Sequence, residues 1–149
     1  MNTVQFLSDV TGQWQGRYKL WLDPNKDPAI SDTSLVVKPT ANNSYFLIHY
    51  DWVFNGDSKA GIFLIGGKDL QAQATWGDSF HMEPLPMNCE GELDNHTLVL
   101  NGRYDAGGEK WGWRTEFTKD QGQLVMRAYN IAPTGDEDIA LEAVYQVHA

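Results

Sequence analysis

Apolar and polar residues alternate with a period of two through nearly the whole chain after Gly12. The segment from Gln13 to Leu20 shows the pattern, because Trp, Gly, Tyr and Leu occupy the even positions and Gln, Arg and Lys the odd ones. Successive side chains of a strand point to opposite faces of the sheet, so the segment predicts a strand with one dry and one wet face. The chain is therefore expected to be an all-β protein.

Similar segments recur at intervals of about 10–12 residues, which is the spacing of antiparallel barrels and sandwiches. Residues such as Asn55-Gly56 mark the hairpin turns between them, because a type I′ turn needs two residues that tolerate positive φ. Asp94-Asn95 is a weaker turn signal, and residues 120–122 suit a type I turn followed by a glycine bulge. The pattern predicts roughly ten strands, at residues 13–20, 35–38, 44–54, 58–65, 70–76, 88–93, 97–104, 110–118, 123–131 and 139–148.

A sandwich and a barrel both fit this strand pattern, and three features favour the barrel. Val4, Phe6, Leu7 and Val10 form a short apolar helical stripe that ends at Gly12. A strand and a series of hairpins follow, and closing the last strand on the first removes exposed strand edges. We expect one domain over residues 1–149: a roughly ten-stranded antiparallel up-and-down barrel with a short N-terminal helix.

The charge balance narrows the class of partner. Lys and Arg number 11 and Asp and Glu number 20, so the formal charge is 11 − 20 = −9. Such an acidic surface repels phosphate backbones and anionic lipid headgroups, so nucleic acid and membrane partners are not expected. A single cysteine, Cys89, cannot form an internal disulfide, and the N-terminus shows no secretion signal. These features predict a cytoplasmic protein.

Several short motifs resemble known barrel families. The run from Gly12 to Gly16 is similar to the Gly-x-Trp-x-Gly opening of calycin-type barrels, which include lipocalins, fatty-acid-binding proteins and nitrobindin-like haem barrels. Residues 66–69, 76–81 and 142–145 look like those of uncharacterised bacterial lipocalin-like proteins. The resemblance implies the barrel fold and an interior that holds a small apolar molecule, but it implies no catalytic activity.

Two motifs of the chain match functional positions of these families. Fatty-acid-binding barrels anchor a carboxylate with Arg-x-Tyr on the last strand, and this chain has Arg127-Ala128-Tyr129 on the strand before the last. Nitrobindin-like barrels hold haem through a histidine near the C-terminus, where this chain has His148 as its penultimate residue. No cofactor is expected, with haem as the alternative.

A turn at residues 120–122 would set the register of its hairpin and define a candidate ligand site. Lys119 would face Gln123, which places Thr115 opposite Arg127 and Trp113 opposite Tyr129. If that face points inward, Arg127 lies among aromatic residues and could bind a ligand carboxylate. Alternatively, Arg127 reaches the rim or pairs with an internal acid. The predicted ligand-binding residues are Arg127, Tyr129, Trp113 and Phe117, together with Trp14 and Tyr18 of the first strand.

The Asn55-Gly56 hairpin sets Tyr50 opposite Gly61 and Trp52 opposite Lys59, on a heavily aromatic face that is the better core candidate. The other face carries Leu47, Ile62 and Leu64 around His49 and Asp51, and it is also apolar. Either the N-terminal helix covers this second face or a second subunit does, so a homodimer is possible. His49 and Asp51 form a possible proton-transfer pair, although such pairs more often lie at the sheet surface.

Metal and hydrolase motifs are absent from the sequence. The four histidines lie far apart and outside any ligand spacing, so no metal site is expected. Ser79 and His81 lack the nucleophile elbow of a triad hydrolase.

The sequence therefore favours binding of a small apolar or aromatic, and possibly anionic, molecule inside the barrel. One alternative is a cofactor-free decarboxylase or cyclase that uses Arg127, Tyr129 and a carboxylate such as Asp51 or Glu116. Another is a filled barrel that acts as a structural or interaction module.

Overall fold

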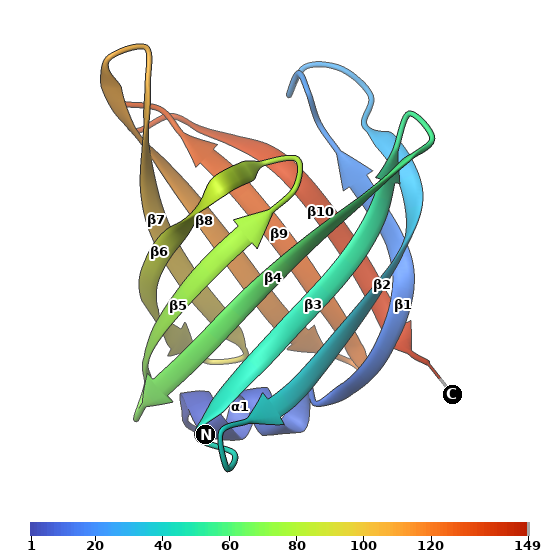
Figure 1. Cartoon of the computed structure of the whole chain (residues 1–149), viewed down its shortest axis with the longest axis vertical. Helices are drawn as coiled ribbons and strands as arrows, with labels where there is room; N and C mark the ends of the chain where they lie inside the picture. The colour runs from blue at the N-terminus through green and yellow to red at the C-terminus, as the bar shows by residue number, and fades with distance from the viewer. Residues whose placement is uncertain (149) are drawn as a thin grey trace.

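Ten antiparallel strands form a closed barrel in the computed structural model, which describes residues 1–148 (Figure 1). Each strand pairs with the next along the chain, and β1 pairs with β10, so the expected up-and-down topology is confirmed. The elements are α1 (Thr3–Asp9), β1 (Gly12–Leu20), β2 (Ala29–Thr40), β3 (Tyr45–Phe54), β4 (Asp57–Lys68), β5 (Gln71–Asp78), β6 (Met82–Asp94), β7 (Thr97–Ala106), β8 (Glu109–Asp120), β9 (Gln123–Ile131) and β10 (Glu137–Val147).

Helix α1 lies across one end of the barrel and closes it (Figure 1). Asn2 begins the helix with a capping box shared with Gln5, and Phe6 and Leu7 are buried against the barrel interior. The Trp14 indole donates a 2.9 Å hydrogen bond to the Val10 carbonyl, which ties the helix end to β1. We call the end of the barrel opposite α1 the mouth. Among the described residues, no helix is long and apolar enough to cross a membrane.

The period-two pattern places the core inside the barrel. The alternate residues Phe46, Ile48, Tyr50 and Trp52 of β3 are each at most 2% exposed. The register predicted from Asn55-Gly56 is confirmed, because Trp52 pairs with Lys59 and Tyr50 with Gly61. Both turn residues have positive φ, as a type I′ turn requires.

Two glycines allow side chains from strands on either side of them to meet. Gly16 of β1 lies in register with Thr33 of β2 and Tyr145 of β10, and those two hydroxyl groups approach to 3.0 Å beneath it. A Cβ at Gly16 would overlap the carbonyl oxygen of Val144. Gly61 of β4 plays the same part, because the Tyr50 ring lies across it. These close approaches require glycine at both positions.

The β8–β9 hairpin departs from the predicted register by one residue. Asp120 pairs with Gln123, so the turn contains only Gln121 and Gly122, with φ of 49° and 80°. A glutamine thus adopts the left-handed conformation that the prediction had reserved for glycine alone. Because side chains alternate, this shift moves Arg127 and Tyr129 to the opposite face of the sheet.

The barrel wall separates between β6 and β7 near the mouth. The two strands pair only over Glu90–Asp94 and Thr97–Asn101, and residues 102–106 of β7 have no partner on β6. Residues 83–86 of β6 include Pro84 and Pro86, which lack the N–H groups that pairing would need. The same segment bulges where β6 pairs with β5. The two prolines therefore extend the opening toward the mouth, because they have no N–H group to donate to β7.

The outer face of the β3–β4 hairpin stays uncovered. Ile62 is 43% exposed and Leu64 is 44% exposed, and α1 lies at the barrel end rather than over them. Of the two alternatives for this face, cover by the N-terminal helix is therefore wrong. A homodimer through this face stays a prediction.

Candidate ligand-binding site

Six aromatic rings gather at the mouth, and we call them the mouth cluster. Tyr18 stacks on Trp52 with ring centroids 4.4 Å apart, and Trp76 stacks on Trp113 at 5.0 Å. His81 lies between these two stacks, 5.8 Å from Trp52 and 5.2 Å from Trp113. Phe80 meets Trp52 edge-on at 5.3 Å. Rings from β1, β3, β5, β8 and the β5–β6 connection are therefore brought together at one level of the barrel.

A buried carboxylate anchors the cluster. Asp78, at the end of β5, is 3% exposed and accepts a 2.5 Å hydrogen bond from the Tyr50 hydroxyl. Its other oxygen accepts the backbone N–H groups of Phe80 and His81, at 2.8 and 3.0 Å. The Trp76 indole donates in turn to the Tyr50 oxygen at 3.0 Å. Asp78 therefore holds the β5–β6 connection inside the mouth, with the rings of Phe80 and His81 pointing into the cluster.

Burial shifts the titration of the groups around Asp78. Burial, and then the negative charge of Asp78, raise the pKa of Tyr18 and Tyr50 well above the ordinary tyrosine value. Burial lowers the pKa of His81, while Asp78 acts in the opposite direction. The His81 Nε2 atom lies 3.5 Å from the Tyr18 hydroxyl, which is a long contact. At neutral pH the phenols of Tyr18 and Tyr50 and the imidazole of His81 are therefore neutral.

The lowered pKa of His81 makes stability depend on pH. The unfolded chain has an ordinary histidine pKa of about 6.5, so below that pH it binds more protons than the folded protein. The free energy of unfolding should therefore fall as the pH drops below about 6.5, by at most about 1.4 kcal/mol per pH unit from this residue. Urea unfolding at neutral and mildly acidic pH measures the effect. His81→Phe keeps a ring in place, and its pH dependence should be flatter; an unchanged profile would contradict the assignment.

A solvent-open groove of about 1410 Å³ reaches this cluster from the side. It begins on the outer face of strands β4, β5 and β6 and continues into the separation between β6 and β7. We call it the β6–β7 groove. Its inner wall includes Met82, Met87, Cys89 and Tyr104, and also His81 of the mouth cluster. Burial raises the pKa of the Cys89 thiol to about 11, so this group is a thiol rather than a thiolate at neutral pH.

Below the mouth the barrel is filled by its own side chains. Phe63 packs edge-on against Phe117 at 5.3 Å, and both are 1% exposed. Ile65, Leu98 and Leu100 are also fully buried. The lower half of the barrel interior is therefore occupied by these apolar side chains.

Two of the six predicted ligand-binding residues belong to the mouth cluster, namely Tyr18 and Trp113. Phe117 lies deeper and reaches the cluster through Phe63, which stacks on Trp76 at 5.9 Å. Trp14 lies at the closed end, where it binds the helix terminus.

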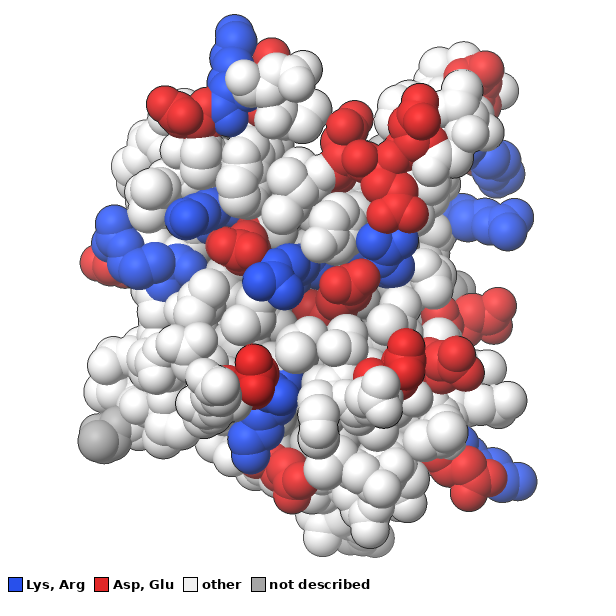
Figure 2. All heavy atoms as spheres, turned by 180° about the vertical axis from the view of Figure 1, so that it is seen from behind, with Lys and Arg blue, Asp and Glu red and all other residues white. Residues whose placement is uncertain are grey.

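The prediction that Arg127 and Tyr129 share the inward face with Trp113 is wrong. The shifted register places both on the outer face, where Arg127 pairs with Glu142 at 2.8 Å. The Arg114 guanidinium lies over the Tyr129 ring at 4.6 Å and also bonds Glu116 and Glu137. Figure 2 shows basic and acidic side chains interspersed over this side of the barrel. Arg127 therefore does not point into the barrel and cannot bind an anionic group there.

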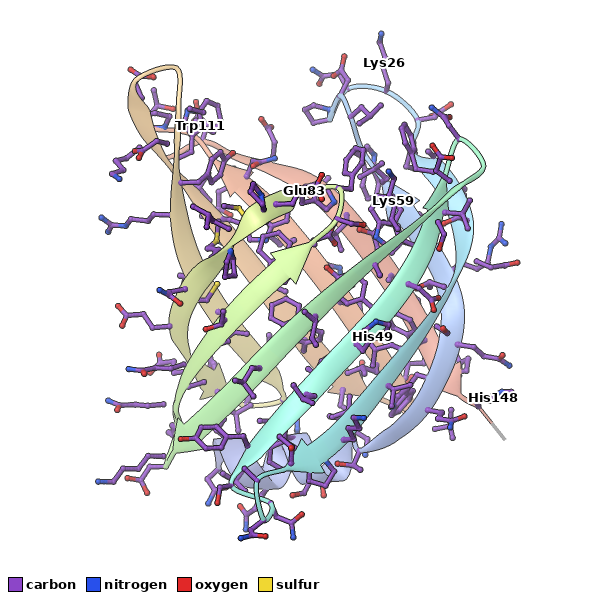
Figure 3. All side chains as sticks on the ribbon, viewed as in Figure 1. Lys26, His49, Lys59, Glu83, Trp111 and His148 are labelled. Carbon is purple, nitrogen blue, oxygen red and sulfur yellow. The ribbon has the colours of Figure 1, made fainter. Side chains whose placement is uncertain are left out.

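The remaining predicted residues also lie outside the interior. His49 and Asp51 are exposed on the outer face of β3, and Asp51 accepts a 2.8 Å bond from Ser34 (Figure 3). His148 follows β10 and points away from the barrel (Figure 3). Arg127, Tyr129, Asp51 and Glu116 thus do not converge on an interior site, and the decarboxylase or cyclase alternative loses the residues on which it was based.

Sequence reasoning missed Asp78 and His81 as site residues. One signal was present, because the predicted register set Gly61 opposite Tyr50. A glycine opposite an inward tyrosine indicates that the ring lies across the glycine toward the next strand, which here carries Asp78. The position of His81 had no such signal, because it depends on how the β5–β6 connection folds back.

Ten strands in a closed meander, a helix at one end and aromatic rings at the other define an up-and-down β-barrel protein. The chain belongs to the family described as "Protein of unknown function (DUF1579)", whose model matches residues 2–146. Its fold is similar to that in the "Crystal Structure of Rv2717c from M. tuberculosis", with a TM-score of 0.70 and 13% sequence identity over 98% of this chain and 97% of that one. No curated protein matches the chain. The lipocalin-like resemblance thus extends to a shared barrel architecture.

Proposed function

We propose that this protein binds a small apolar or aromatic molecule at the mouth end of the barrel. The observation that supports this most directly is that His81 belongs to both features of the site. It lines the β6–β7 groove and also stacks within the mouth cluster, so the groove leads to the aromatic rings. Ligand sites are commonly concave, largely apolar and aromatic, with a few polar groups that fix orientation.

The polar groups of the site are few and buried. Asp78 and Tyr50 are bonded to one another, and the sulfur-containing side chains of Met82, Met87 and Cys89 form an adaptable groove wall. Four tryptophans or tyrosines facing one position supply stacking area without a large loss of side-chain entropy.

Tryptophan fluorescence tests the proposal, because three indoles lie at or next to the site. A panel of indole, naphthalene, retinol, a long-chain fatty acid and haemin should include at least one molecule that quenches or shifts the emission, with a Kd below about 100 μM, or about −5.5 kcal/mol. If none of them binds at that level, the barrel is a filled structural or interaction module.

A mutation in the groove wall tests the route of entry. The Met87 side chain lies across Gly102 and fills part of the opening between β6 and β7. Met87→Ala should raise the association rate of a bound panel molecule by about 3–10-fold in stopped-flow fluorescence, because it widens the entrance. Met126→Ala is the matched control, since Met126 is equally buried on β9 in the far wall. Each variant should lose about 2–4 kcal/mol of stability. Equal rates for the two variants would place the entrance elsewhere.

A further inference from the structure

The protein fills its own mouth cluster with a heteroaromatic ring. The His81 imidazole is stacked on Trp52 and tilted against Trp113, and its centroid lies 6.3 Å from Trp76. Its backbone N–H and that of Phe80 are held by one oxygen of Asp78. The cluster is therefore shaped around a planar ring, and a carboxylate that binds the backbone N–H groups beside this ring lies nearby.

The charge inside this part of the barrel is negative. Among residues 1–148, Asp78 is the only charged residue in the buried core. It accepts three hydrogen bonds and donates none, as an ionised carboxylate does. The whole chain carries a net charge of −9, which adds to the potential that attracts cations. Indole and phenol faces are also electron-rich and favour a cation beside them.

A second polar group of the cluster has no partner. Trp52 is only 1% exposed, and its buried Nε1 atom makes no hydrogen bond. Buried indole N–H groups usually have an acceptor. Here the neighbouring side chains are the rings of Tyr18, Phe80 and His81. A bound molecule with an acceptor oxygen would satisfy this donor.

We infer that the mouth cluster takes an aromatic monocation that carries a hydroxyl group, and that this molecule replaces His81. This inference rests on the proposed binding function and specifies its ligand class. The ring of the guest stacks on Trp52 where the imidazole now lies. Its ammonium group donates to the Asp78 oxygen that now accepts the two backbone N–H groups. Its hydroxyl oxygen accepts from the Trp52 indole.

One basic residue, Lys59, lies close enough to the mouth cluster to favour an anionic guest over a cationic one. Lys59 is in register with Trp52, and its half-buried side chain lies at the rim of the mouth (Figure 3). Glu83 lies at the same rim on the β6 side (Figure 3). Water at the rim screens the half-buried Lys59 ammonium in part, whereas the carboxylate of Asp78, which is 3% exposed, is screened much less. Asp78 should therefore set the charge preference.

Three molecules with the same 4-hydroxyphenyl ring separate charge from shape: tyramine, tyrosol and 4-hydroxyphenylacetate. Near neutral pH they are a cation, a neutral alcohol and an anion. Isothermal titration of the wild-type protein should give a Kd for tyramine at least 10-fold below that for tyrosol, with 4-hydroxyphenylacetate weaker still. Equal affinities, or tightest binding of the anion with loss of that binding in Lys59→Met, would overturn the inference. Binding of only the neutral panel molecules would overturn it too but leave the proposed function standing, whereas no binding at all would remove both.

Two variants test the position of the guest. Trp52→Phe keeps a ring but removes the unpartnered N–H, so it should weaken tyramine by about 3–10-fold and leave phenethylamine, which lacks the hydroxyl, nearly unchanged. His81→Ala empties the place of the imidazole and should tighten tyramine by a similar factor. His49→Ala, on the outer face of β3, is the control and should leave both affinities unchanged. If His81→Ala and His49→Ala behave alike, His81 does not occupy the site of the guest.

Discussion

Replacing Gly16 by alanine is expected to destabilise the protein by about 2–4 kcal/mol. The new Cβ would overlap the carbonyl oxygen of Val144, which belongs to the backbone of β10 and cannot rotate away. Overpacking of this kind costs about 1–3 kcal/mol by itself. To relieve the overlap, β1 and β10 would have to move apart, which would separate the hydroxyl groups of Thr33 and Tyr145 that meet at 3.0 Å beneath the glycine. Loss of this buried hydrogen bond adds about 1 kcal/mol.

The effect is large because it acts on barrel closure. β1 and β10 are the first and last strands, and their pairing is the contact that turns the sheet into a barrel. Urea unfolding followed by far-ultraviolet circular dichroism measures the loss. Gly77→Ala is the matched control, because Gly77 is also a strand glycine but has open space where its Cβ would be. That variant should stay within about 0.5 kcal/mol of the parent. Equal stability of the two variants would contradict the role given to Gly16.

The barrel could be predicted from the sequence because its signals are local. Alternation and turn residues identify each strand, and they placed the β3–β4 register correctly because Asn55-Gly56 has one favoured turn. The strands whose extent was underestimated are those with weak local signals. β2 begins at Ala29, well before the predicted start at Leu35, since its first residues are mostly polar and its inward Thr33 is satisfied by Tyr145.

The candidate site was harder to predict because it depends on distant contacts. A turn with Gln121 in the left-handed region slipped the β8–β9 register by one residue, which was enough to move Arg127 from a binding role to an outer ion pair with Glu142. β6 begins at Met82, six residues before the predicted start at residue 88, and its first half contains Pro84 and Pro86. Those same prolines mark the place where the wall separates, so they were a signal for the groove rather than for a loop.

Asp78→Ala is expected to cost about 3–5 kcal/mol, the second large effect. The change removes the acceptor of three hydrogen bonds and leaves the Tyr50 hydroxyl and the backbone N–H groups of Phe80 and His81 without partners. Each buried unsatisfied group costs about 1–3 kcal/mol, although the two backbone groups recover part of this by moving to water. Chemical unfolding gives the free energy, and near-ultraviolet circular dichroism reports whether the mouth cluster stays ordered.

A double-mutant cycle with Tyr50→Phe decides whether Asp78 acts through these bonds. Tyr50→Phe leaves Asp78 with its two backbone partners but also removes the acceptor of the buried Trp76 indole N–H, so it should cost about 2–4 kcal/mol. In the double variant the tyrosine hydroxyl no longer exists to be left unpaired. The double variant should therefore lose less stability than the sum of the two single losses, by at least about 1 kcal/mol. Additive losses would mean that Asp78 stabilises the fold independently of Tyr50, and the buried network would then not be the element that holds Phe80 and His81 in the mouth.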